Sequence, residues 1–182
     1  RGLNGGTEEL AQRLGVTQPL LFRYFPTKIA MIDRIFHEIE SSAFDRDWVS
    51  LLTDESVRLE DRLVGFYSDY FEKVMTKENF RLFLYRGLAW PESSHRYYGD
   101  MQRLIYPAIA RAIRASLPAG ARAKGRITDR ELEMVLTLHA IIYHLGIRRW
   151  VFGIPLKGRI RDLIRLKIAI FLRGVGAAAI GK

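Results

Sequence analysis

The segment from Thr17 to Tyr24, TQPLLFRY, carries a hydroxyl, an amide, a guanidinium and a phenol on eight consecutive residues. Amides and guanidinium groups can form hydrogen bonds with the edges of DNA bases, whereas hydroxyls and cations can contact phosphates. Pro19 and Phe22 could contact the methyl groups of thymine. If the segment is helical, these outward side chains could enter a major groove of DNA: Thr17, Gln18, Pro19, Phe22, Arg23 and Tyr24.

A short helix is expected just before this segment. Thr7 is a typical N-cap residue, and two glutamates follow it in the first turn. Ala11 supplies a small residue where two helices would cross, and Gly15 supplies the backbone freedom needed at the turn between them. Val16 and Leu21 are apolar anchors behind the second helix. This spacing favours a helix-turn-helix motif, while an amphipathic helix pair of another kind is the alternative.

The rest of the chain repeats apolar residues with a helical period and shows no hairpin signal between alternating runs. Thr27 is expected to cap a third helix, and Thr128 with Glu131 forms the pattern of a capping box. Pro107 should kink or divide the helical segment that contains it. The sequence therefore predicts an all-α chain in two parts, hinged near the third helix.

The charge of the 182-residue chain is unevenly distributed. It has 29 Lys and Arg against 20 Asp and Glu, for a net charge of +9, which invites a nucleic-acid interpretation. Residues 1–40, however, carry five basic and five acidic side chains, whereas residues 81–182 carry 19 and six. The excess lies away from the predicted DNA-binding segment, and a set of solvated helix faces explains it equally well.

Several classes of protein are disfavoured by the same sequence. There is no cysteine, so disulfides and thiolate metal sites are excluded, and a soluble cytoplasmic protein is expected. No apolar run reaches the roughly 20 residues that cross a bilayer. No catalytic motif is present, and His139 and His144 are five residues apart, which suits a metal poorly. Gly174, Gly176 and Ala179 outline a dinucleotide fingerprint, but no strand precedes them. We expect no enzyme, cofactor or metal.

The stretch from Thr7 to Ile39 resembles the TetR family of transcriptional regulators. The resemblance implies a dimer that places two recognition helices in successive major grooves of a palindromic operator. It would assign Gln18 and Arg23 to base edges, and Thr17, Tyr24 and Lys28 to phosphates. Leu20 and Phe22 depart from the hydroxylated residues often found there. The residues in register with the family pattern are Val16, Thr17, Leu21, Phe22, Tyr24, Phe25, Thr27 and Lys28.

The same resemblance implies two domains with different functions. Residues 1–43 would be the DNA-binding domain, and residues 44–182 an effector-binding and dimerisation domain. Since the sequence begins at Arg1, we expect most of the family's first helix to lie upstream. The protein would be a ligand-responsive regulator of the repressor type. The alternative is an all-α homodimeric interaction module whose basic surface binds an acidic partner or a membrane surface, without reading DNA sequence.

An effector and a partner subunit each need a surface in the second part. Aromatic residues of the middle helices could line an apolar cavity, although such stripes can also form plain core. The candidate effector-binding residues are Phe66, Tyr70, Tyr85, Arg86, Trp90, Tyr106, His139 and Tyr143. The last two helices of the family form its dimer interface. The candidate residues there are Leu136, Ile142, Leu145, Arg149, Ile164, Ile168 and Phe171.

Overall fold

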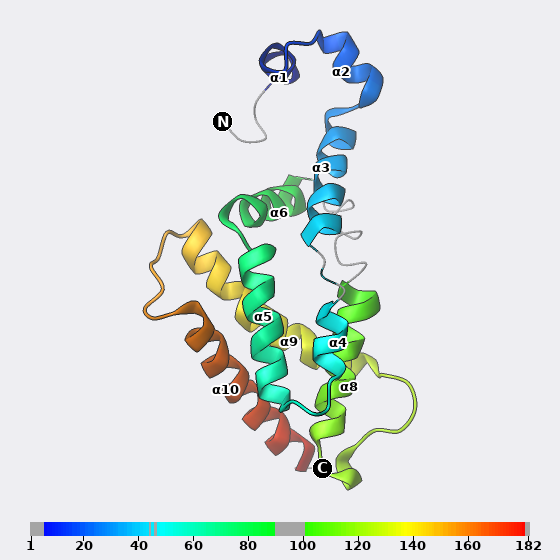
Figure 1. Cartoon of the computed structure of the whole chain (residues 1–182), viewed down its shortest axis with the longest axis vertical. Helices are drawn as coiled ribbons and strands as arrows, with labels where there is room; N and C mark the ends of the chain where they lie inside the picture. Colours follow the sequence, from blue (N-terminus) through cyan, green and yellow to red (C-terminus); the bar gives the residue numbers. More distant parts are fainter. Residues whose placement is uncertain (1–5, 44, 46, 90–100, 181–182) are drawn as a thin grey trace.

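The computed structural model describes residues 6–43, 45, 47–89 and 101–180, and its regular elements in these ranges are all helical. The all-α prediction is confirmed for this part of the chain. Helices α1 and α2 lie at one end of the molecule, and α3 leads from them to a body built from the later helices (Figure 1). The α-helices are α1 (Thr7–Arg13), α2 (Gln18–Tyr24), α3 (Lys28–Ala43), α4 (Asp47–Thr53), α5 (Leu59–Lys73), α6 (Lys77–Ala89), α8 (Tyr106–Ser116), α9 (Asp129–Gly146) and α10 (Ile160–Ile180).

The turn between α1 and α2 has the predicted chemistry. Gly15 has a φ of +67°, a backbone conformation that side chains with a Cβ disfavour. The Thr17 hydroxyl accepts a hydrogen bond from the backbone N–H of Leu20 and caps α2. Thr27 caps α3 in the same way, accepting from the N–H of Ala30 at 3.0 Å. The prediction for Thr7 was wrong, because α1 begins at this residue and no side chain caps it.

Helix α5 lies at the centre of the body. It packs against α10 along one side and against α4 and α8 along others, as Figure 1 shows for α5 and α10. Its side chains Leu63, Phe66 and Tyr67 are completely buried. Burying an apolar side chain of this size contributes about 1.5–3 kcal/mol. The packing of α5 therefore supplies much of the free energy that holds the later helices together.

Pro107 lies where its helical segment changes from π-helix to α-helix. A π-helical turn spans Met101–Ile105, and α8 starts at the next residue with Pro107 in its first turn. Tyr106, the first residue of α8, is buried in the core.

Hydrogen bonds and an ion pair of Arg114 join α8 to the start of α9. The guanidinium of Arg114 donates to both carboxylate oxygens of Glu131 at 2.6 Å and to the backbone carbonyls of Gly125 and Arg126. Thr128 and Glu131 also form both hydrogen bonds of the predicted capping box. The bond from Arg114, with those from Thr128, lowers the pKa of Glu131 to about 2. These interactions hold in place the loop between α8 and α9, which contains the 3-10 turn Ala119–Ala121.

Candidate DNA-binding surface and buried aromatic cluster

One face of α2 anchors the helix and the opposite face is open. Leu21 is buried, together with Ala11 of α1, at the crossing of the two helices. The guanidinium of Arg23 lies 5.6 Å from the centre of the Tyr24 ring, and no ion pair engages it among the described residues. Five of the predicted DNA-binding residues are exposed: Thr17, Pro19, Phe22, Arg23 and Tyr24.

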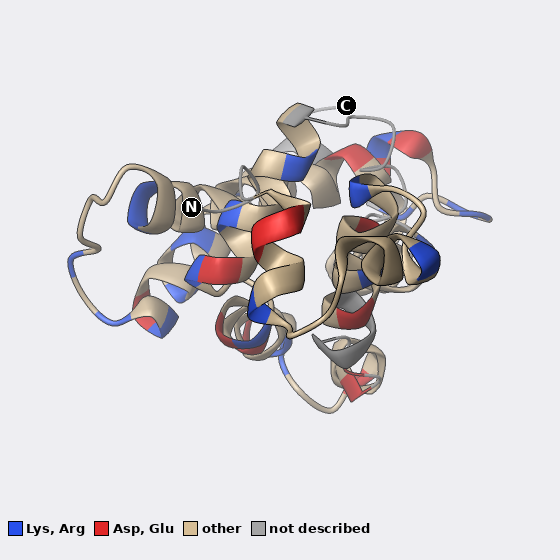
Figure 2. Cartoon of the chain, turned by 90° about the horizontal axis from the view of Figure 1, so that it is seen from above, with Lys and Arg blue, Asp and Glu red and all other residues tan. Residues whose placement is uncertain are grey.

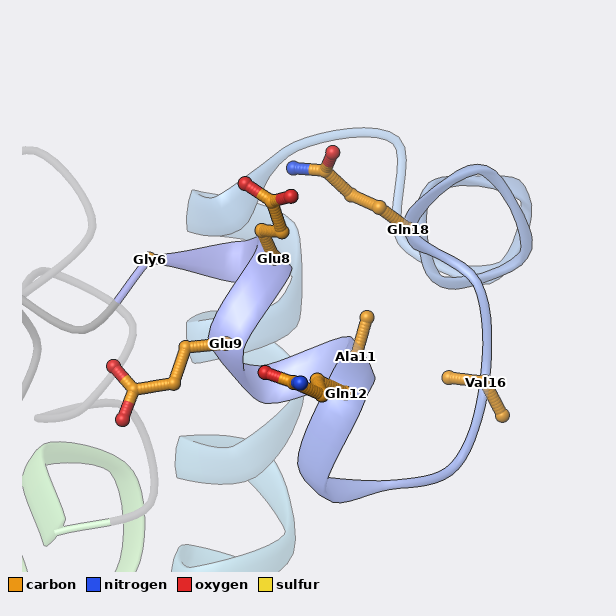
Figure 3. A pocket seen from close by; sticks show the side chains of 7 residues that line it. All are labelled: Gly6, Glu8, Glu9, Ala11, Gln12, Val16 and Gln18. Carbon is orange, nitrogen blue, oxygen red and sulfur yellow. The ribbon is translucent and has the colours of Figure 1, made fainter.

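The two remaining predicted DNA-binding residues are only partly exposed. Gln18 turns back toward α1, where its Nε2 donates a hydrogen bond of 2.8 Å to the Thr7 hydroxyl. Figure 3 shows its side chain extending over the end of α1, near Glu8. A base contact by Gln18 would therefore require a change of rotamer. Lys28 is half-buried at the first position of α3.

An open hollow of about 760 Å³ lies between α1 and the turn to α2. Ala11 and Val16 form its apolar part, and Gln18 lies on its rim (Figure 3). The carboxylates of Glu8 and Glu9 also line it, and negative groups repel phosphates. We therefore leave the hollow out of the candidate DNA-binding surface.

Five of the eight candidate effector-binding residues come together in the core of the body. The ring of His139 lies 5.5 Å from that of Tyr106, 5.6 Å from that of Tyr70 and 6.2 Å from that of Tyr143. Phe66 packs 5.8 Å from Tyr70. Tyr143 is half-buried at the edge of the group. We call the following set the aromatic cluster: Phe66, Tyr67, Tyr70, Tyr106, His139 and Tyr143.

Tyr67 is the member that the candidate set omitted. Its ring is fully buried and lies 6.1 Å from that of His139. The signal was in the sequence, because Tyr67 is three residues before Tyr70 and so shares its side of α5. Its neighbours, two further tyrosines and a histidine, are distant in sequence, and only the packing of α5, α8 and α9 brings them together.

The other three candidates do not join the cluster. Tyr85 is exposed on α6, and Trp90 lies outside the described residues. Arg86 is buried, but its Nη2 lies 3.1 Å from Oδ1 of Asp33 in α3. Its guanidinium also stacks 4.5 Å from the centre of the Phe36 ring. The structure therefore shows Arg86 linking α6 to α3.

The aromatic cluster contains polar atoms without protein partners. Neither the hydroxyl of Tyr67 nor Nδ1 of His139 has a hydrogen-bond partner among the described residues. Burial lowers the pKa of His139 to about 4, so the imidazole is neutral at pH 7. Burial also raises the pKa of Tyr67 well above its usual value, with Tyr106 and Tyr70 adding to the effect. The cluster is thus an uncharged polar centre inside an apolar core.

We expect the free energy of unfolding to fall as the pH drops from 6.5 toward 4. In that window the unfolded chain protonates His139 while the folded chain does not, so the unfolded state binds more protons. The lowered pKa of His139 corresponds to a loss of about 3 kcal/mol in the free energy of unfolding across this window. Urea unfolding of wild type and His139→Phe at several pH values measures it. His139→Phe should lose most of the dependence of the free energy of unfolding on pH. His144→Phe, a change on the exposed side of α9, should keep it. An equal dependence on pH in all three proteins would contradict the prediction.

Most of the candidate dimer residues are buried within this chain. Ile142 and Leu145 of α9 are completely buried within this chain, so they close the core of the monomer. Ile164, Ile168 and Phe171 of α10 belong to the same core. Leu136 is half-buried against it, and Arg149 is exposed with its guanidinium 4.3 Å from the Trp150 ring. The apolar residues that α10 does expose are Leu166 and Ile170, at 57% and 62%.

Two further findings hold for the described residues. None of their helices is long and apolar enough to cross a membrane. Within the same ranges, no three His, Cys, Asp or Glu side chains are grouped so that they could hold a metal ion.

Comparison with known proteins gives a match at the N-terminus and a likeness over the whole fold. Residues 1–35 match the family described as "Bacterial regulatory proteins, tetR family". The fold is similar to the crystal structure of "a putative TetR-family transcriptional regulator" from Mesorhizobium loti MAFF303099, with a TM-score of 0.65 at 13% sequence identity. That alignment covers 93% of this chain and 86% of the other. No curated protein sequence matches the chain.

Proposed function

We propose that this TetR-family transcriptional regulator binds a palindromic operator as a dimer and is released by a small-molecule effector. The basis is that its first 35 residues match the tetR family and that its fold is like that of such a regulator. The observation that carries the proposal is the open face of α2. Its exposed guanidinium, phenol and phenyl groups stand on a helix anchored through Leu21. Such a helix suits the major groove. We infer a cytoplasmic repressor with no enzymatic activity.

Selection of bound genomic DNA fragments by the protein tests this proposal. Enrichment of a palindromic sequence is expected, because a symmetric dimer reads two equal half-sites. Fragments that show no common sequence would overturn it in favour of an interaction module. Figure 2 gives that alternative little support, since Lys and Arg lie on several elements among Asp and Glu and do not gather on one of them.

The exposed face of α10 supports a dimer. Leu166 and Ile170 are one helical turn apart and point away from the core, which α10 contacts through Ile164 and Ile168. Large exposed aliphatic side chains in a row suit a contact between two copies of the same surface. We therefore move the proposed interface from the buried residues of α10 to the face that includes Leu166 and Ile170.

Replacing Leu166 and Ile170 together with glutamate is expected to convert the dimer into a monomer. Charges of the same sign would face each other across the two-fold axis and lose their hydration there. Sedimentation velocity at micromolar concentration measures the change. Leu88→Glu is the matched control, because Leu88 is 85% exposed on α6 and lies outside the proposed interface. A double variant that sediments like the wild type would reject this interface.

Helix α6 supports communication between the effector site and α3. Near one end of α6, the Phe80 ring packs 4.5 Å from that of Tyr143 in the aromatic cluster. Near the other end, Arg86 pairs with Asp33 of α3, and Phe83 lies 5.3 Å from Phe36. Figure 1 shows α6 lying between the body and α3. We propose that an effector shifts the population of α6 positions and, through α3, the spacing of the two recognition helices.

A further inference from the structure

An ion pair attaches the link between α3 and α4 to the body. Asp45 lies in this link, and its Oδ2 is 2.9 Å from Nζ of Lys73, the last residue of α5. Oδ1 of Asp45 accepts a hydrogen bond of 2.9 Å from the backbone N–H of Asp47, where α4 begins. The bond from Lys73, with that from Asp47, lowers the pKa of Asp45, so its carboxylate is charged at pH 7. Asp45 thus joins the start of α4 to the end of α5.

The cation of this pair has a second anion on its own helix. Nζ of Lys73 is also 2.9 Å from Oδ2 of Asp69, one turn earlier in α5. The same oxygen accepts a hydrogen bond of 2.6 Å from the indole N–H of Trp48, which is buried against Phe66 of α5. If Asp45 moves away, Lys73 keeps Asp69 and Trp48 still holds α4 on α5. The contact between Asp45 and Lys73 can therefore open without leaving the cation unpaired.

A second ion pair attaches α3 itself to the body. Asp33 lies 3.1 Å from Arg86 of α6, and ten residues, or about 15 Å of helix, separate it from the end of α3 at Ala43. Two separated points of attachment fix the direction of a rod, whereas one point leaves it free to swing. Figure 1 shows α3 joining α1 and α2 to the body. The direction of α3 therefore sets the position of the DNA-binding helices.

The two points of attachment differ in their exposure to solvent. The side chain of Arg86 is 5% exposed, whereas that of Lys73 is 46% exposed. Exposed ion pairs contribute little to stability and weaken as salt is added, while buried pairs are screened much less. The contact between Asp45 and Lys73 is therefore the attachment that opens more easily.

We propose that Lys73 is a positioning residue for DNA binding, which holds α3 in one direction through its contact with Asp45. Without this contact, α3 would take a wider range of directions about its attachment at Arg86. A palindromic operator demands one spacing of the two recognition helices, and a wider range leaves a smaller fraction of dimers at that spacing. The inference rests on the proposed function for this last step. The direction of α3 can be measured without DNA.

Distances within one chain test the positioning of α3. The sequence has no cysteine, so Arg13→Cys in α1 and Arg111→Cys in α8 provide two exposed sites for spin labels. Double electron–electron resonance, on labelled protein diluted with unlabelled protein, gives the distribution of distances between the two labels. This distribution should broaden when Lys73→Met or Asp45→Asn is added, because each change removes the contact. Unchanged distributions in both variants would overturn the proposal.

Three further variants separate the contact from a general effect of charge. Lys73→Arg keeps the cation and should restore the narrow distribution. Lys124→Met is the matched control, because it removes the same charge from an exposed position in the loop between α8 and α9. The double variant with Lys73→Met and Asp45→Asn should broaden the distribution no more than either change alone. An equal broadening in Lys124→Met, or additive effects in the double variant, would show that the contact does not hold α3.

Operator affinity is a separate measurement. Lys73→Met should weaken operator binding by about two- to fivefold, the factor that one partly exposed ion pair can supply. Fluorescence anisotropy measures the loss. Unchanged or tighter binding, together with a broadened distribution, would refute the role of Lys73 in DNA binding. If the wild type selects no palindromic sequence, the proposed function fails, while the distances still decide whether Lys73 positions α3.

Discussion

Replacing Arg23 with alanine is expected to weaken specific operator binding by about 5- to 150-fold, the equivalent of the 1–3 kcal/mol that a good contact with a base edge contributes. Arg23 is exposed on the open face of α2, and its position next to the Tyr24 ring leaves its guanidinium available to a groove. Fluorescence anisotropy with the operator found by fragment selection measures the loss. Because Leu21 still anchors the helix, thermal unfolding should be unchanged.

The control separates a base contact from a general loss of charge. Arg13→Ala removes the same charge from α1, where the side chain pairs with Glu9 at 2.9 Å on an exposed surface. This variant should lower specific and non-specific binding alike and only slightly. Arg23→Ala should instead reduce the ratio of specific to non-specific affinity. If both variants change that ratio equally, Arg23 does not read a base.

Gln18 makes this experiment more informative. In the structure its amide is bound to Thr7, so the free protein does not present it to a groove. Adding Gln18→Ala to Arg23→Ala should reduce affinity further only if the side chain turns outward on the operator. An unchanged affinity would assign Gln18 to holding α1 and α2 together and leave base reading to Arg23.

The sequence was most informative where the physical signal is local. Gly15, Thr17 and Thr27 act on backbone atoms within a few residues, so their roles at the turn and at the helix starts could be predicted without knowing the fold. Thr128 and Glu131 are an equally local pair. Thr7 shows the limit, because its hydroxyl is used by Gln18, eleven residues away, and not by its own helix.

The sequence was least informative about what each helix faces. Helical periodicity shows that Ile164 and Ile168 share a side of α10, but it cannot tell whether that side meets the same chain or a second copy. The structure places them in the monomer core and leaves Leu166 and Ile170 outside. The partner of Arg86 could not be predicted for a related reason. Its partner Asp33 lies in another helix far along the chain, and periodicity carries no information about such pairs.

The junction of α6 with α9 gives the second large expected effect. Gly146 is the last residue of α9 and is buried against the start of α6. A Cβ at this position would lie 2.5 Å from Cε2 of Phe80 and 2.9 Å from Cε of Met75. Phe80 cannot move freely, because its ring is completely buried and packed against that of Tyr143. The close approach of the two helices therefore requires glycine at this position.

Gly146→Ala is expected to lower the free energy of unfolding by about 1–3 kcal/mol, the usual cost of overpacking a core. Alanine favours a helix over glycine by about 0.5–1 kcal/mol, so any loss arises from the clash and not from the backbone. Urea unfolding at a fixed protein concentration measures it. The matched control is Gly65→Ala in α5, where the nearest atom would be the flexible end of Leu51 at 3.2 Å.

The control should change stability by less than about 1 kcal/mol, since helix propensity and a small shift of Leu51 oppose each other. If Gly146→Ala and Gly65→Ala were equally stable, Phe80 and Met75 would be able to move aside without a loss of stability. The packing of α6 against α9 would then be loose. That outcome would also weaken the proposed communication, because a helix that adapts freely cannot pass a displacement of Tyr143 on to Arg86 and Asp33. A large loss confined to Gly146→Ala would instead mean that α6 is held firmly enough to act as the connecting element.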